Sequence, residues 1–282
     1  MALADPIPFR RRRPTVTVLR LSGAIGAASP LRGGLSGHEL AQPIARAFAG
    51  RRLSAVALVI NSPGGSPVQS ALIHQRIRAL ASEKKVPVLA FVEDVAASGG
   101  YWLACAADEI IADPHSIVGS IGVISAGFGF QDLLGRIGVE RRLHTSGERK
   151  SMLDPFRPEQ PEDVERLARL QAEIHNGFKQ WVRERRAGKL KTDEATLFSG
   201  EFWTARRGLE LGLVDGLGEL RSTLQARFGA NVHLPVIGPR RRLLSRLGLG
   251  AATEVERTGI EAIGAATLAA IEERLHWQRF GL

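Results

Sequence analysis

The 282-residue chain has a formal net charge of +9, an apolar fraction of 44% and a charged fraction of 24%. These values are typical of a soluble globular protein with one large core domain. Cys105 is the only cysteine, which excludes an intrachain disulfide and a cysteine-rich metal site. No run of about 18 apolar residues is present, so we expect no membrane-spanning helix and predict a cytosolic protein.

Alternating and β-branched residues predict strands in the first half of the chain, at 15–20, 55–60, 87–92, 109–112, 118–125 and 139–144. Helical patterns lie between several of them, at about 38–49, 67–83, 99–106 and 130–137. Repeated alternation of strands and helices predicts a layered α/β fold with largely parallel strands.

Further helices are predicted in the second half, at about 161–186, from 193 and at 205–211, before a short strand at 232–237. The longest has an apolar stripe of Val164, Leu167, Leu170 and Ile174. We therefore divide the chain into a basic tail (1–13), a core domain (14–237) and an Arg-rich linker with a C-terminal amphipathic helix (238–282). This last helix, over 252–276, could pack on the core, on another subunit or on a membrane surface. We rank packing against protein above the membrane.

Positive charge gathers in clusters at Arg10–Arg13, Arg51-Arg52, Arg183–Arg186 and Arg240–Arg242 with Arg246. Such clusters could meet anionic lipid or nucleic acid. No nucleic-acid-binding pattern accompanies them, so we predict no specific nucleic-acid partner. A solvated surface is the first interpretation, and peripheral contact with anionic membrane headgroups, at the inner membrane, is the second.

The stretch Asp94–Tyr101 carries the strongest chemical signal. It links the strand-like run Val86–Val92 to the helix-like run Trp102–Ala106. A small-residue turn between strand and helix can expose the Ser98 hydroxyl beside backbone N–H groups. The turn is therefore a candidate nucleophile elbow, although small-residue turns are also common without any catalytic role.

Two other segments could contribute to the same chemistry. The run Ala55–Ile60 ends in Asn61–Ser66, whose two glycines expose backbone N–H groups that suit an oxyanion hole. In Ser116–Val123 a hydroxyl residue, Ser120, stands between glycines in an apolar run and needs a polar partner. Each segment alone could be an ordinary turn or strand.

Lys150 precedes a mixed segment, Ser151–Arg157, and by itself would be an ordinary surface lysine. Together with the other segments, however, it completes a resemblance to signal peptide peptidase A-like serine peptidases of peptidase family S49. That family is related to the Clp protease and crotonase folds. The matching segments are Asn61–Gly65, Asp94–Tyr101, Gly119–Val123, Lys150–Phe156, and Gly200–Ala205 with Gly208–Asp215.

The resemblance implies a Ser–Lys dyad and no cofactor or metal ion. Ser98 would be the nucleophile, Lys150 the general base and Ser120 the residue that orients the lysine. The N–H groups of Gly65 and Gly99 would form the oxyanion hole. A lysine acts as a base only when uncharged, and apolar surroundings favour that form. Met152, Leu153 and Phe156 are close enough in sequence to supply them.

The resemblance also implies peptide substrates, namely unfolded or signal-peptide-like apolar peptides. Family members often carry an N-terminal anchor or a second related domain, and from the sequence we expect neither here. We therefore expect a ring-like homo-oligomer, with the dyad within one subunit or shared between neighbours. The alternatives are a crotonase-like acyl-CoA enzyme, which needs only paired N–H groups, and a catalytically silent peptide-binding scaffold. None of the histidines lies in a triad-like context, which argues against a Ser-His-Asp site.

Overall fold

The computed structural model describes residues 13–26, 34–238, 274 and 277–281. The described strands are β1 (Val16–Ser22), β2 (Ala55–Ser62), β3 (Val88–Ala97), β4 (Glu109–Ala112), β5 (Ile117–Gly119), β6 (Phe202–Thr204), β7 (Gly216–Leu217) and β8 (Val236–Ile237). The described helices are α1 (Gly37–Ala47), α2 (Pro67–Lys84), α3 (Gly99–Ala104), α4 (Gln131–Arg136), α5 (Pro161–Arg185), α6 (Glu194–Leu197), α7 (Ala205–Leu211) and α8 (Leu220–Phe228).

The strands form one sheet in the order β6-β5-β3-β2-β1-β8, with β4 beside β3 and β7 beside β4. All pairs are parallel except β5–β6, which confirms the predicted parallel α/β fold. β3 is long enough to pair with β4 through its first half and with β5 through its last residues. The carboxyl end of β3 therefore lies between β2 and β5.

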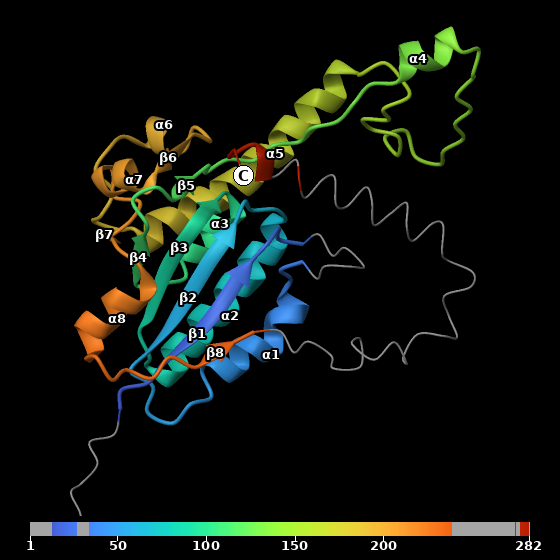
Figure 1. Cartoon of the computed structure of the whole chain (residues 1–282). Coiled ribbons are helices and arrows are strands. Elements are labelled where there is room, and N and C mark those ends of the chain that lie inside the picture. The colour runs from blue at the N-terminus through green and yellow to red at the C-terminus, as the bar shows by residue number, and fades with distance from the viewer. Residues whose placement is uncertain (1–12, 27–33, 239–273, 275–276, 282) are drawn as a thin grey trace, which may run out of the picture.

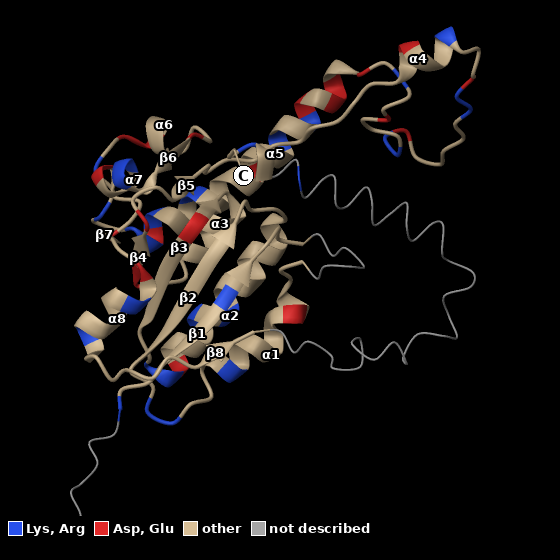
Figure 2. Cartoon of the chain, in the orientation of Figure 1, with Lys and Arg blue, Asp and Glu red and all other residues tan. Residues whose placement is uncertain are grey.

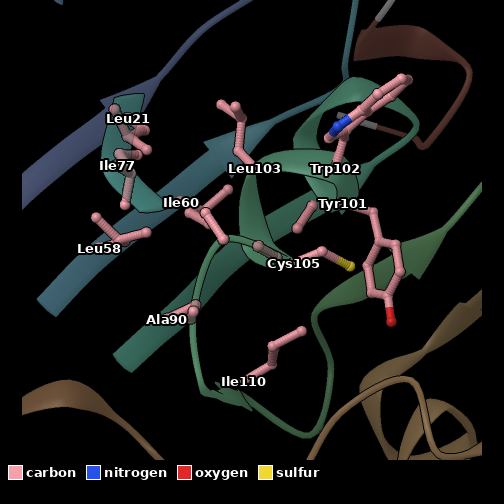
Figure 3. Packing of buried hydrophobic residues seen from close by; sticks show 14 of the residues in the cluster. Leu21, Leu58, Ile60, Ile77, Ala90, Tyr101, Trp102, Leu103, Cys105 and Ile110 are labelled. Carbon is pink, nitrogen blue, oxygen red and sulfur yellow. The ribbon is translucent and has the colours of Figure 1, made fainter. Parts of the chain in front are cut away.

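Both faces of the sheet are buried, as expected for parallel strands. Helices α1, α2, α3, α5 and α7 contribute side chains to the larger cluster on one face (Figure 1). Figure 3 shows part of this cluster, including Ile77 of α2 and Leu103 of α3. Helix α8 covers the opposite face through Leu224, which packs with Val18, Val59 and Phe91. Because side chains alternate along a strand, two sets of buried β3 residues face opposite sides of the sheet. The helical layer covers Val88, Ala90, Val92 and Ala96, whereas α8 and the chain end cover Leu89, Phe91, Val95 and Ala97.

Several predicted boundaries are wrong. The segment 139–144 forms no strand, although its residues alternate, because it lies away from the sheet and no described strand pairs with it. The strand predicted at 118–125 is limited to β5, and residues 120–125 form no strand. Helix α8 was not predicted from the sequence. The predicted helix at 252–276 and the basic tail lie almost entirely outside the described residues, so they stay predictions, as do the domain boundaries.

Residues 122–160 form a projection that we call the arm (Figure 1). It leaves the sheet after β5, carries α4 and returns at the start of α5. Helix α4 buries none of its side chains, and only Phe178 and Val182 of α5 are buried. Three members of the predicted stripe, Val164, Leu170 and Ile174, are therefore exposed. None of the described helices has the length and hydropathy needed to span a bilayer.

The basic cluster at Arg183–Arg186 is not a free positive surface. Arg183 pairs with Glu194 at 2.7 Å and Arg185 with Asp108 at 3.0 Å. Arg186 is buried and pairs with Asp215 at 2.6 Å. Acidic residues accompany basic ones over this part of the surface (Figure 2). The clusters at 10–12 and 240–246 lie outside the described residues, so membrane contact stays a prediction.

A buried histidine makes the stability of the fold depend on pH. His74 of α2 is fully buried, and its ring lies 4.4 Å from that of Trp181, centroid to centroid. Burial, with the positive charges of Arg185 and Arg78, lowers the pKa of His74 to about 3. The unfolded chain takes up this proton near pH 6.5 and the folded chain does not until about pH 3. The contribution of buried, uncharged His74 to the free energy of unfolding is thus complete above about pH 6.5 and is lost as the pH falls toward 3.

We predict that His74 makes the protein acid-sensitive. Between pH 6.5 and 5 this residue should lower the free energy of unfolding by about 2 kcal/mol. Urea denaturation of His74→Phe across this range should show a flatter pH dependence than the parent. His144→Gln serves as the control, since the His144 side chain is exposed and no ion pair joins it to another described residue, and it should keep the parental slope. An unchanged slope in His74→Phe would contradict the assignment.

Candidate active site

The turn at Ser98 joins β3 to α3 in a strained conformation. Its φ of 52° and ψ of −122° are unusual for a residue with a side chain, and they direct the chain sharply from strand to helix. Although Ser98 occupies the N-cap position of α3, its hydroxyl makes no capping hydrogen bond. The side chain is half-buried. This geometry suits the candidate nucleophile elbow, because Oγ lies at the end of a central strand and hydrogen-bonds no residue that the structure describes.

A glycine loop, residues 63–66, follows β2 and packs directly against this turn. A Cβ added at Gly64 would lie 2.8 Å from Ser98 Cβ and 2.9 Å from the Gly99 nitrogen. A Cβ added at Gly65 would lie 2.1 Å from the Ile25 carbonyl oxygen. Both glycines have positive φ, at 105° and 139°. The loop therefore requires glycine both for its conformation and for the close approach.

The two predicted oxyanion donors lie side by side. A Cβ added at Gly99 would be 3.4 Å from the Gly65 nitrogen, so the two backbone amides are neighbours. Within the described part of the chain, neither N–H donates a hydrogen bond. Gly99 is the first residue of α3, where an N–H has no partner inside the helix. Two free donors beside a serine hydroxyl can stabilise an oxyanion that forms on an attacked carbonyl.

Ser120 is held next to the Ser98 turn by backbone hydrogen bonds. The Ser98 N–H donates to the Gly119 carbonyl at 2.8 Å, and the Ser120 N–H donates to the Glu201 carbonyl at 2.7 Å. Ser120 is buried, and no described residue hydrogen-bonds its hydroxyl. The structure thus brings Ser98, Gly65, Gly99 and Ser120 together from three separate segments.

Lys150 does not join this group within the chain. It lies on the arm, in a turn where its N–H donates to the Gly147 carbonyl at 3.2 Å, and its side chain is exposed. No hydrogen bond connects its amine to Ser98 or Ser120. The apolar surroundings expected from Met152 and Phe156 are not formed around Lys150 here. Instead, the Phe156 ring packs 5.6 Å from the Phe130 ring, centroid to centroid.

The described histidines do not supply another base. His175 Nε2 lies 3.0 Å from the Ile121 carbonyl oxygen, and His115 Nδ1 lies 3.1 Å from Asp113. Neither contacts Ser98. Cys105 is equally inert, because burial raises the pKa of its thiol to about 12.

A buried polar network that the sequence did not reveal supports the helix behind Ser98. Tyr101 Oη donates to the Leu213 carbonyl at 2.7 Å, which ties α3 to the turn before Asp215. The Cys105 sulfur lies toward the Tyr101 ring (Figure 3). Burial would raise the pKa of Asp215, but hydrogen bonds from Arg186 and Lys189 hold it below its ordinary value. The only sequence signal was the matching segment that contains Leu213 and Asp215.

A cavity of about 530 Å³ lies on the face of the sheet covered by α8, away from the helical layer. Val18, Val59 and Phe91 line its apolar floor, and Glu219 and Arg221 lie at its edge. Ser98, Ser120, Gly65 and Gly99 are not among its lining residues. The cavity therefore does not belong to the Ser98 site.

Residues 80–230 match peptidase family S49, a region that includes Ser98, Ser120 and Lys150. The matched region is more than half of the 282-residue chain. The chain belongs to peptidase family S49. The family predicted from the sequence motifs is thereby confirmed, and Gly65 lies before the matched region.

Relatives include the chloroplastic serine protease SPPA of Arabidopsis thaliana, 30% identical over 231 residues, which are 79% of this chain and 33% of that protein. Protease 4 of Salmonella typhi is 30% identical over 207 residues (73% of this chain, 33% of that protein). The protein named Na(+)/H(+) antiporter NhaA of Brucella abortus (strain 2308) is 53% identical over 282 residues, 98% of this chain and 38% of that protein. The chain thus spans about two fifths of this antiporter-named relative. Two of these three relatives are named as proteases.

Solved structures share the fold. The 1510-N membrane-bound stomatin-specific protease, as a serine-to-alanine mutant, gives a TM-score of 0.51 at 16% identity and covers 81% of this chain and 99% of that one. Its lysine-to-alanine mutant in complex with a substrate peptide gives 0.51 at 17% identity, covering 83% and 98%. This likeness confirms the Clp protease/crotonase-like fold class.

We predict that the glycine loop tolerates no side chain. Gly65→Ala should lower the free energy of unfolding by about 1–3 kcal/mol, because its Cβ collides with backbone and its φ is unfavourable. Gly129→Ala, on the arm with nothing within 4 Å of its added Cβ, is the matched control and should change it by less than about 0.5 kcal/mol. Thermal unfolding measures both. Parental stability in Gly65→Ala would contradict the close approach.

Proposed function

We propose that the chain is a serine endopeptidase that cleaves unfolded or signal-peptide-like apolar peptides with a Ser98–Lys150 dyad. The observation that carries the proposal is the strained Ser98 turn beside the free N–H groups of Gly65 and Gly99. This combination suits acyl transfer, in which a hydroxyl attacks a carbonyl and negative charge develops on its oxygen. Peptidase-family membership favours this function over the crotonase-like alternative.

In the proposed reaction, Ser98 Oγ attacks the scissile carbonyl carbon and its proton passes to the uncharged Lys150 amine. The carbonyl oxygen becomes an oxyanion and accepts hydrogen bonds from Gly65 and Gly99. When the C–N bond breaks, the leaving amine takes the proton from the lysine, and an ester remains on Ser98. Water then attacks this ester with the lysine again as base, which releases the second product and restores the serine hydroxyl.

We further propose that a second copy of the chain delivers Lys150. The lysine is exposed on the arm and makes no contact with Ser98 in its own chain. The arm also exposes large apolar side chains: Phe128 is 78% exposed and Ile124 64%. The stripe on the first half of α5 is exposed as well. Contiguous exposed apolar surface is typical of a protein interface, so we infer assembly through the arm into a homo-oligomer, with a ring as the expected form.

For location, we propose a soluble protein with peripheral contact at a membrane surface. The Arg clusters near both ends of the sequence motivate this, and electrostatic attraction to anionic lipid would provide it. The Brucella relative contains a segment similar to this chain within a longer protein named as an antiporter. Sedimentation with anionic vesicles at low salt tests the contact, and absence of binding would remove it.

We predict that Ser98→Ala and Lys150→Ala each reduce the cleavage of an unstructured apolar peptide by at least about 10³-fold. Lys150→Arg should be equally inactive, because a guanidinium does not lose its proton. Arg149→Ala is the neighbouring control on the arm and should keep parental activity. Parental activity in Ser98→Ala would favour a catalytically silent scaffold and a contaminating protease.

Mixing the two inactive variants tests the shared site. If Ser98 and Lys150 come from different copies, a mixture of Ser98→Ala and Lys150→Ala that has been dissociated and reassembled should recover activity. Random 1:1 mixing restores an intact pair at about a quarter of sites in this two-copy arrangement. No recovery, in a mixture shown by native mass spectrometry to contain both variants, would place the dyad within one chain.

We also predict that kcat/KM rises with pH. The base must be uncharged to accept the Ser98 proton, so activity follows the fraction of deprotonated lysine. Peptide cleavage measured at constant ionic strength gives the profile, and solvent isotope effects show whether proton transfer limits the rate. A flat profile with a chemistry-limited rate would contradict a lysine base.

A further inference from the structure

The end of the chain packs behind the Ser98 turn. Phe280 is 8% exposed and joins Val95 and Ala97 of β3 in a small buried cluster. Trp277 and Ile117 of β5 pack against the same cluster. The described C-terminal residues accordingly lie beside β5 (Figure 1). Ala97 directly precedes Ser98, so the contact lies one residue from the proposed nucleophile.

Phe280 also reaches the third strand of this region. Its ring lies 5.0 Å from the Phe202 ring of β6, centroid to centroid, in an edge-to-face arrangement with an interplanar angle of 71°. Phe202 pairs with Gly119 across the β5–β6 ladder. The chain end therefore contacts β3, β5 and β6 together through two aromatic side chains.

These strands fix the distance between Ser98 and Ser120, yet their own pairing is short. β5 and β6 have 3 residues each. One hydrogen bond joins Ser98 to Gly119, and another joins Ser120 to Glu201. Such short ladders are marginal without packing on their faces. The helical layer covers one face through Val118, and Trp277 and Phe280 cover the other.

We propose that Trp277 and Phe280 are positioning residues for the Ser98 site. They hold β3, β5 and β6 in register from the face opposite the helical layer, so that Ser98 keeps its place relative to Ser120 and the oxyanion donors. The inference rests on the proposed function, in which Ser98 is the nucleophile. Neither aromatic residue takes part in the chemistry. Displacement of a reacting group by about 1 Å can reduce a rate by about 100-fold, so loss of this support should lower kcat.

The test compares full-length Phe280→Ala and Trp277→Ala with Leu224→Ala. Leu224 is fully buried on the same face of the sheet but packs near the start of the strands, away from Ser98. We measure kcat and KM for an unstructured peptide well below each variant's Tm, and the rate at which a fluorophosphonate labels Ser98. Phe280→Ala and Trp277→Ala should lower kcat and labelling by roughly tenfold or more, with KM changed less than about twofold. Leu224→Ala should lower Tm and leave kcat near the parental value.

Phe280→Leu keeps an apolar contact and should recover most of the lost kcat, which also provides a folded variant if Phe280→Ala does not fold. The inference is overturned if both aromatic variants keep parental kcat, or if Leu224→Ala loses kcat to the same extent. Ser98→Ala in the same assays separates a failure of the proposed function from a failure of this inference. If it is labelled and cleaves like the parent, the proposed function fails, whereas a Ser98-dependent activity that is indifferent to Trp277 and Phe280 overturns this inference alone.

Discussion

The backbone of the glycine loop meets the backbone of the Ser98 turn so closely that no side chain fits between them. Gly64 and Gly65 lie against Ser98 and Gly99 at the carboxyl ends of β2 and β3. This contact places beside one hydroxyl two N–H groups that donate to no described residue, and it depends on the parallel pairing of the two strands. The rest of the fold serves to keep these two turns in place.

Buried polar groups hold the helix that follows Ser98. Tyr101 links α3 to the segment before Asp215, and Asp215 holds Arg186 at the end of α5. A buried charge without its partner is costly, so this network fixes one arrangement of the elements around α3. The turn that carries the proposed nucleophile is consequently preorganised within a single chain, which would lower the cost of reaching the transition state in the proposed reaction.

The proposed base is organised differently. Lys150 lies on an arm with exposed apolar side chains and no described contact with Ser98. One chain would thus carry the nucleophile in its rigid core and the base on its arm. This arrangement is consistent with an arm that packs on a second copy, because burial of its apolar surface would drive assembly. Activity would then depend on assembly, since an isolated chain would have a nucleophile without its base.

The sequence by itself determined the parallel α/β fold, the family and the residues of the Ser98 turn, because these depend on local patterns. Strand and helix periodicities repeat over short stretches, and Gly64, Gly65 and Ser98 stand in recognisable strand-to-helix turns. The strand predicted at 139–144 was wrong, because alternating residues form a strand only when a second strand pairs with them.

Only the tertiary structure decided which residues meet. It placed Ser120 next to Ser98 through β5 and β6, and it placed Phe280, the most distant of these residues in sequence, behind Ala97. It also left Lys150 outside the Ser98 site of its own chain, which the order of motifs along the sequence could not indicate. The physical reason is that motif spacing limits what the chain can reach, whereas the packing of whole elements sets the distance between two side chains.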